Sequence, residues 1–398
     1  MLVLKYFSGM VPERLNQRAC LWFKATFLLL VLSLSPHTLF ATRTAVEASL
    51  PATTEEVSQA GDTPEASQEG FDAGKLIIGH VLDTHGWHLF DIGEREISIP
   101  LPVILVYKGR FHVFLSSRFH HGHSAYKGFR IAYNDSKSGK IIRVLPDGVT
   151  PDPEASYVLD LSITKNVFSI FIACFLLCWI FIRAARNYRK FSGESIPLRF
   201  TSLLEPLIIF IRDQIALGSI GPKHYERFLP YLLTLFFFIF FNNLLGLVPF
   251  FPGGANVTGN ISVTMTLALF TFFTTQIFGN KAYWNHIFNT PGVPFFLKLP
   301  IPLMPVIELV GVVIKPFVLM IRLFANITAG HMIILGFVSI IFVLGSVNPY
   351  FGFGATPLSV VFLIFMTFLE ILVAFIQAYV FTLFSALFFG MAVPEEHH

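Results

Sequence analysis

The sequence has little charge and few cysteines. Only 13% of its 398 residues are Asp, Glu, Lys or Arg, whereas 54% are hydrophobic and 46 are Phe. A soluble domain carries about 25% charged residues, so this composition excludes that class and indicates a polytopic membrane protein. Three cysteines are too few for a disulfide framework. Cys174 and Cys178 lie one helical turn apart in an apolar stretch, which favours packing over a metal or redox role.

Two patterns typical of other membrane proteins are also missing. We find no convincing internal repeat, which a secondary transporter with paired broken helices would show. There is no HExxH motif, and no third ligand at the depth of His331 and Glu370, as an intramembrane metallohydrolase would need. A transporter that binds an anionic substrate through Arg322 is kept as the alternative function.

The first 70 residues predict an exported N-terminus. Arg14, Arg18 and Lys24 precede a short apolar core at residues 25–34, and small residues follow near Ala41. Such a core is too short for a span and is typical of a secretory signal. We therefore expect a signal peptide at residues 1–41, with an uncleaved anchor as the alternative. Residues 42–70 are rich in Ala, Thr, Ser, Gln and Glu, and are expected to be a disordered leader.

Residues 71–157 predict a small β-rich domain outside the cytoplasm. Residues 80–90 are expected to form a short helix or surface segment. Gly, Pro and Asn-Asp breaks separate four expected strands, at residues 96–107, 111–116, 128–133 and 140–145. A zinc site needs three or four converging ligands with second-shell support. Three roles therefore stay open for the domain's histidines: a metal site, a proton-buffering surface, and solvated or packing positions. These histidines are His80, His85, His88, His112, His120, His121 and His123.

Five apolar stretches in residues 158–398 are expected to span the membrane, giving an all-α membrane domain. The first, at residues 161–182, is followed by five basic residues, Arg183, Arg186, Arg189, Lys190 and Arg199. Positive loops lie on the cytoplasmic side, which agrees with an exported N-terminus and puts the C-terminus in the cytoplasm. Residues 200–217 are interrupted by charges and predict an interfacial helix. The other spans are expected at residues 228–248, 261–278, 305–344 and 357–392.

The stretch at residues 305–344 carries ionisable side chains where a membrane helix ordinarily has none. Each costs about 2.5 to 3.5 kcal/mol on insertion scales, so Glu308, Lys315, Arg322 and His331 imply water, partners or a charge pathway. As one helix this stretch would be roughly 60 Å long. A bilayer core is about 30 Å thick, so this helix and the next are expected to be steeply tilted and to curve around a partner.

Depth and rotation separate these side chains into layers. Arg322 and Gln377 are nearly equidistant from residue 350, as are His331 and Glu370, so an antiparallel hairpin turning within residues 345–356 puts each pair at one depth. At about 100° per residue, Glu308, Lys315 and Arg322 share a face, while His331 points the opposite way. Arg322 and His331 are therefore not expected to form one site.

Several motifs resemble subunit a of the F-type ATP synthase, from about residue 160 to the end. They are Leu-Met-Ile-Arg-Leu-Phe-Ala-Asn at residues 319–326 with Ala329-Gly330, Glu308, Lys315-Pro316, Asn-Asn-Leu-Leu-Gly-Leu-Val-Pro at residues 242–249, and Gln377. Many bacterial members carry Glu after the Ala-Gly and His seven residues before the Gln. This sequence has His331 and Glu370, the exchanged arrangement, which retains an acid and a base. Residues 71–157 depart from the short N-terminus of the best-known members.

The resemblance implies a non-catalytic stator subunit in a bacterial inner membrane, with a periplasmic N-terminal domain. It would form two offset half-channels against a c-ring of small hairpin subunits, held by b-type peripheral stalk subunits and joined to the catalytic head. Arg322 would separate the half-channels and favour the carboxylate form of the ring acids. His331 and Glu370 suit the outer half-channel and Glu308 the inner one. No cofactor, metal or nucleic acid is expected, and the choice between H⁺ and Na⁺ stays open.

Structural explanations compete for each of these residues. For Arg322 the structural alternative is an ion pair with Glu370, although the estimate of depth given above puts Glu370 nearer His331. Lys315 is better explained as a snorkelling charge than as a pathway member. Asn326 and Gln377 are equally typical of hydrogen bonds between membrane helices. Asn242 and Asn243 are expected to be packing features that support the site.

Overall fold

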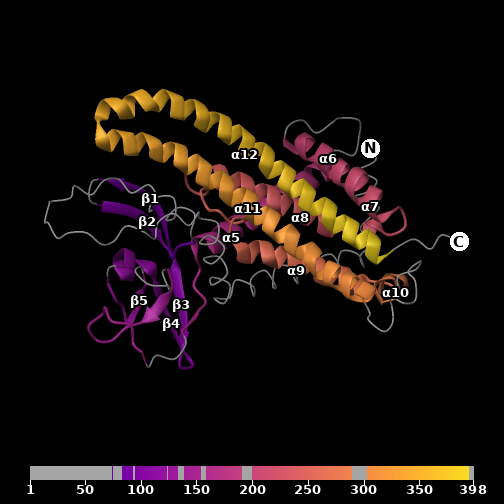
Figure 1. The fold of residues 1–398 in the computed structure, drawn as a ribbon, viewed down its shortest axis with the longest axis horizontal. Coiled ribbons are helices and arrows are strands. Elements are labelled where there is room, and N and C mark those ends of the chain that lie inside the picture. Colours follow the sequence, from indigo (N-terminus) through magenta and orange to yellow (C-terminus); the bar gives the residue numbers. More distant parts are fainter. Residues whose placement is uncertain are drawn as a thin grey trace.

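The computed structural model describes residues 74, 83–92, 95–122, 124–132, 139–153, 158–190, 200–288 and 303–393. A small β-containing N-terminal region lies beside a larger helical part (Figure 1). The predicted signal peptide and leader lie outside the described residues, as do His80 and His123.

The N-terminal region contains short antiparallel pairings. Strand β1 (Gly86–Ile92) pairs with β2 (Arg95–Pro100). Strand β3 (Pro102–Tyr107) lies between β4 (Arg110–Leu115) and β7 (Leu159–Asp160). Strand β5 (Phe129–Ile131) pairs with β6 (Ile141–Arg143), and a 3-10 helix, η2 (Ser116–Gly122), follows β4. The alternate side chains Val103, Leu105 and Tyr107 of β3 are buried with Phe119 and Phe129, which gives this region its own core.

Two predictions for the N-terminal region need correction. The single strand expected at residues 96–107 is two strands in different sheets, because Pro100 and Pro102 lack the N–H that a continuous ladder requires. Leu101 between them instead exchanges hydrogen bonds with Ser116, donating its N–H to Oγ and accepting from the Ser116 N–H. The helix or surface segment expected at residues 80–90 is also wrong from Gly86 onward, where β1 begins.

The helical part has five helices that are long and apolar enough to cross a membrane, counted over the residues described above. They are α5 (Lys165–Lys190), α8 (Tyr225–Leu247), α9 (Ile261–Phe278), α11 (Leu303–Val347) and α12 (Pro349–Ala392). This confirms a polytopic, mainly α-helical fold. Helix α8 is central: it packs against α5 and α12, and its Leu232, Phe236 and Ile239 are fully buried.

The expected interfacial helix at residues 200–217 is broken into consecutive pieces. An α-helix, α6 (Phe200–Phe210), continues as a π-helical segment, η3 (Ile211–Leu217), and then as one turn, α7 (Gly218–Ile220). Such a π segment shifts which side chains face inward, and it buries Ile211, Ile215 and Ala216. A short helix that the sequence did not predict, α10 (Lys281–Phe288), follows α9.

Helices α11 and α12 form one long hairpin whose tip extends beyond the other helices (Figure 1). The loop expected at residues 345–356 is wrong, because only Asn348 separates the two helices. The Asn348 side chain accepts the Tyr350 N–H at 3.0 Å and caps α12, while Pro349 occupies the first turn, where its missing N–H costs nothing. Pro357 lies inside α12, as membrane helices tolerate.

The hairpin tip depends on a close approach of two glycines. A Cβ placed on Gly352 would lie 2.8 Å from the Gly345 Cα, whereas a Cβ on Gly354 would meet nothing within 4 Å. We therefore expect Gly352→Ala to destabilise the folded protein by about 1 to 3 kcal/mol through overpacking. Gly354→Ala is the matched control, because the same change there improves helix propensity by about 1 kcal/mol without a clash. Thermal unfolding of the purified protein in detergent compares the two, and equal shifts would contradict the close packing.

Candidate functional site

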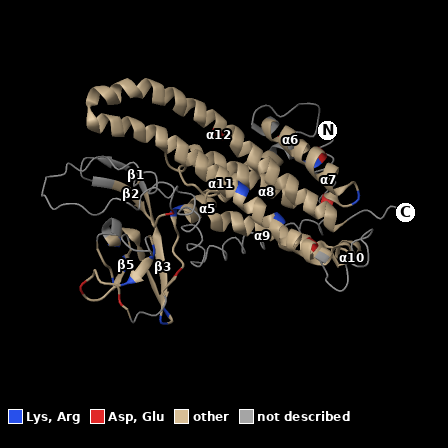
Figure 2. Cartoon of the chain, viewed as in Figure 1, with Lys and Arg blue, Asp and Glu red and all other residues tan. Residues whose placement is uncertain are grey.

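Charged residues are sparse along α11 and α12 (Figure 2). Arg322 is exposed on the surface of α11. Its guanidinium carbon lies 5.3 Å from the ring centroid of Phe384 on α12. Within the described part of the chain, no carboxylate lies within ion-pair distance of this guanidinium. The structure therefore gives no support to an ion pair between Arg322 and Glu370. Lys315 is exposed as well, and Glu308 is partly exposed.

Gln377, the expected neighbour of Arg322, is buried on α12. No hydrogen bond joins the two among the described residues, and Arg322 instead reaches Phe384, two turns further along α12. Side chains lean toward the N-terminus of their own helix. In an antiparallel hairpin that direction leads toward the C-terminal end of α12, so a long arginine meets a later residue than the one level with its Cα.

Glu370 lies in the interior of the hairpin, with only 4% of its surface exposed. Its carboxylate packs against Gly330 of α11 so closely that a Cβ on that residue would overlap it. The absence of a side chain at position 330 is thus what makes room for the acid. Its Oε1 atom has no hydrogen-bond partner within the described ranges.

His331 is next to Gly330 in sequence, but it faces a different helix. A Cβ on Gly246 of α8 would lie 3.4 Å from the His331 Nε2 atom. Successive helical residues differ by about 100°, so the residue that faces Glu370 is Gly330 and the imidazole turns toward α8. His331 and Glu370 share the predicted layer. No hydrogen bond between them is found in the part of the chain that the structure covers.

The connection from α8 to α9 is a polar segment that folds into the protein. Thr258 donates its hydroxyl hydrogen to the Asn243 side-chain oxygen, and the Asn243 amide donates to the Ala374 carbonyl of α12 at 3.4 Å. Thr328 of α11 donates to the Gly259 carbonyl at 3.4 Å. Sequence reasoning missed this segment, although an uncharged run rich in Asn and Thr at residues 255–260 signals it. Asn243 therefore joins three elements around the His331 layer.

Four buried polar atoms lack a hydrogen-bond partner among the described residues: Ser169 Oγ, Asn242 Oδ1, Asn256 Nδ2 and Glu370 Oε1. They come from α8 itself and from elements that pack against it. Buried polar groups in native proteins are almost always paired with protein or ordered water. Each of these atoms therefore offers a position for an ordered water inside the helical part, and one of them belongs to the buried Glu370 carboxylate.

The remaining predicted residues are placed separately. Asn326 is exposed on α11 one turn after Arg322. Asn242 is buried and donates to the Phe238 carbonyl within α8 at 2.8 Å. Among the residues that the structure describes, no group of three His, Cys, Asp or Glu side chains is arranged to hold a metal.

Fold and site together define a polytopic helical membrane protein with ionisable groups inside its spans. The chain belongs to the ATP synthase A chain family, whose model matches residues 167–390. It is 41% identical to an ATP synthase subunit a of Chlorobium phaeobacteroides over 295 residues, covering 70% of this chain and 82% of that protein. It is 38% identical to the ATP synthase subunit a of Myxococcus xanthus, covering 76% and 90%. Residues 76–161 match a domain of unknown function.

The contact between positions 330 and 370 can be tested by disulfide formation. With Gly330→Cys and Glu370→Cys together, the two thiols should oxidise to a disulfide. A Cβ on residue 330 would overlap the Glu370 carboxylate carbon, which is only two bonds from that residue's own Cβ, so the two Cβ atoms are within reach of such a bond. Gly336→Cys with Glu370→Cys is the control, since position 336 is more than one turn further along α11. Mass spectrometry of digested protein detects the linked peptides. Equal linkage of both pairs would show that the register of the hairpin is different.

Proposed function

We propose that this chain is the proton-translocating stator subunit of a rotary ATP synthase. The observation that carries the proposal is Arg322, a cation on the exposed face of a membrane helix with no carboxylate near it among the described residues. A charge inside a bilayer requires a partner or water. Its counter-charge is supplied by another subunit, and acidic groups of a neighbouring c-ring fit this chemistry.

Arg322 acts as a fixed positive charge that separates two aqueous half-channels. An arginine is effectively never deprotonated, so it favours the carboxylate form of a ring acid without relaying the proton itself. A ring acid must be protonated to face lipid, because an ion in hydrocarbon is costly. Release of the proton at Arg322 and uptake on its other side then give rotation a direction. Asn326 and Gln377 are the polar side chains assigned to this barrier, as hydrogen-bond partners for water or a ring acid and not for Arg322 itself.

The outer half-channel contains His331 and Glu370, surrounded by Asn243 and the polar segment before α9. The unpaired oxygen of Glu370 and the other unpaired buried atoms support a water-filled interior there. Glu308, near the start of α11, serves the inner half-channel. Each proton that crosses is driven by about 2.3 kcal/mol per 100 mV of membrane potential.

The remaining parts of the proposal concern partners and orientation. Large apolar side chains are exposed along α11 and α12, including Phe317, Ile321, Phe365 and Phe368, and they fit a ring of small hairpins or lipid. The chain is not an enzyme on its own; b-type stalk subunits hold it and the catalytic head makes ATP. The basic residues that follow α5 favour a cytoplasmic C-terminus and a periplasmic N-terminal domain in a bacterial inner membrane.

Replacing the arginine tests this mechanism. Arg322→Ala should abolish proton-driven ATP synthesis in membrane vesicles while the complex still assembles, because the barrier charge is lost. Arg227→Ala is the matched control: Arg227 is also exposed and lies 4.0 Å over the ring of Phe278, but at the start of α8. Sustained synthesis in the Arg322 variant would refute the mechanism. Purification of a lone polytopic protein, without small hairpin subunits, would favour a transporter instead.

A further inference from the structure

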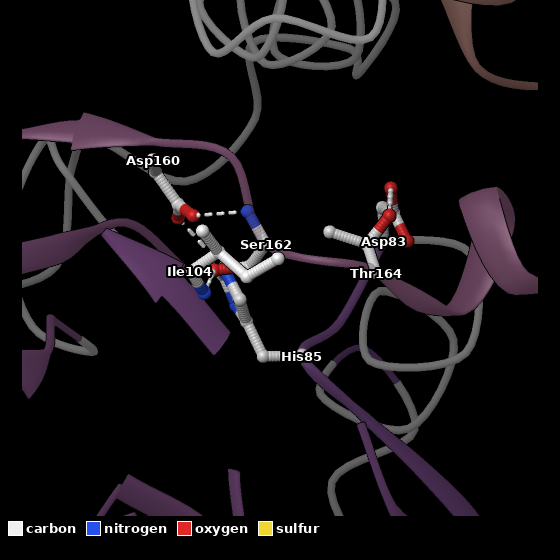
Figure 3. Close-up of polar contacts among 6 residues, drawn as sticks. All are labelled: Asp83, His85, Ile104, Asp160, Ser162 and Thr164. Carbon is white, nitrogen blue, oxygen red and sulfur yellow. Dashed lines mark hydrogen bonds and ion pairs between the residues drawn. The ribbon is translucent and has the colours of Figure 1, made fainter. Parts of the chain in front are cut away.

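A buried polar junction joins the N-terminal domain to the first membrane helix (Figure 3). Asp83 accepts the Thr164 hydroxyl at 2.8 Å and the Asn166 N–H at 3.1 Å. The Thr84 carbonyl accepts the Lys165 N–H at 2.9 Å. The start of α5 has backbone N–H groups without partners inside the helix, and Asp83 satisfies one of them. The domain is thus fixed to the outer end of α5.

A second ionisable pair lies beside Asp83. His85 Nε2 is 2.9 Å from Asp160 Oδ2, and the other oxygen of Asp160 accepts the Ser162 N–H at 2.9 Å (Figure 3). His85 is only 5% exposed, whereas Asp83 is partly exposed. Asp83 is therefore the member of this group that combines contact with solvent and contact with the membrane helix.

Burial raises the pKa of Asp83 above its usual range, against the opposing effects of its hydrogen bonds and of His85 and Lys165. Burial lowers the pKa of His85, but the hydrogen bond and charge of Asp160 and the charge of Asp83 outweigh it, so the net pKa is raised. Burial raises the pKa of Asp160, yet His85 and Ser162 bring it below its usual value. Of the two carboxyls, Asp83 therefore holds a proton more readily than Asp160.

The N-terminal domain also contacts the segment between α8 and α9. Trp87 of β1 packs its ring 6.0 Å from Phe168 of α5 and 5.3 Å from Phe251, in the segment that follows α8. The N-terminal domain therefore lies against the segment whose Gly259 carbonyl accepts the hydroxyl hydrogen of Thr328, about one turn before His331 on α11.

Polar side chains continue from the junction along α5. Asn166 and Ser169 are one turn apart and buried to 3% and 1% exposure, on the helix that packs against α8. The Ser169 hydroxyl has no hydrogen-bond partner in the described chain. A buried hydroxyl of this kind is a typical site for an internal water. The polar face of α5 therefore connects Asp83 with the interior beside α8.

We propose that the N-terminal domain forms the outer entrance of the proton path, with Asp83 taking up protons and passing them to water along the polar face of α5. This inference rests on the proposed function. The Asp83 carboxylate accepts a proton from water on the outer side, releases it to water beside α5, and returns to the carboxylate form. The charged groups that act on Asp83 are His85 and Lys165, and Asp160 holds His85.

Asp83→Asn tests the entrance, because the amide keeps an acceptor for the Asn166 N–H but cannot take up a proton. ATP synthesis is driven by acid-base jumps in vesicles, with the outer-side pH varied at fixed inner pH and fixed potential. We expect ATP synthesis to fall by roughly tenfold at neutral outer pH and by much less at acidic outer pH. A factor of about ten is the low end of the effect that local charge has on association rates. Asp83→Glu should restore the wild-type pH profile.

Asp147→Asn is the matched control, since Asp147 is an exposed acid of the same domain that caps a tight turn. Copurification of this chain with the small hairpin subunits and the catalytic head measures assembly. If an Asp83→Asn complex assembles and keeps the wild-type pH profile, Asp83 is not the entrance of the proton path, while the role of Arg322 is unaffected. If the wild-type complex shows no proton-driven ATP synthesis, the proposed function itself is wrong. If Asp83→Asn does not assemble, Lys165→Gln is the second variant, because it removes a positive charge that acts on Asp83. A dependence of ATP synthesis on outer pH equal to that of the wild type would then overturn the proposal.

Discussion

The free-energy cost of placing an ionisable group in hydrocarbon governs this structure. Helices α11 and α12 carry Glu308, Lys315, Arg322, His331 and Glu370 through stretches that are otherwise apolar. Each of these groups needs water, a hydrogen bond or an opposite charge. The fold meets this requirement in two ways: it packs Glu370 and His331 between helices, and it leaves Arg322 on an exposed surface.

Close packing at glycines makes it possible to place the acid and the histidine between the helices. Because Gly330 has no side chain, the Glu370 carboxylate can lie against the backbone of the facing helix, and Gly246 leaves room for the His331 ring. The polar segment before α9 then adds side-chain and backbone hydrogen bonds through Asn243 and Thr328. The acid, the histidine and the asparagine come from three helices, so the layer exists only when all three are packed together.

Much of this arrangement could be predicted from the sequence. Hydropathy located the five spans, and helical periodicity separated the face of Arg322 from that of His331. The turn was correctly placed within residues 345–356, but its length was wrong: Gly, Pro and Asn between apolar runs are typical of a loop, whereas here Asn348 alone separates the helices. The junction at Asp83 was missed because it joins segments 81 to 83 residues apart through tertiary contacts that no local pattern reveals.

The nearly uninterrupted hairpin also has a mechanical consequence. With 45 residues in α11 and 44 in α12, each arm is about 65 Å long at 1.5 Å per residue, and a single non-helical residue joins them. Two antiparallel rods in contact resist bending far better than one rod, since bending must shear the packed surface between them. A sideways load on any point of the exposed face is therefore spread along the whole hairpin as elastic deformation. The hairpin can serve as a stiff spring against a moving neighbour.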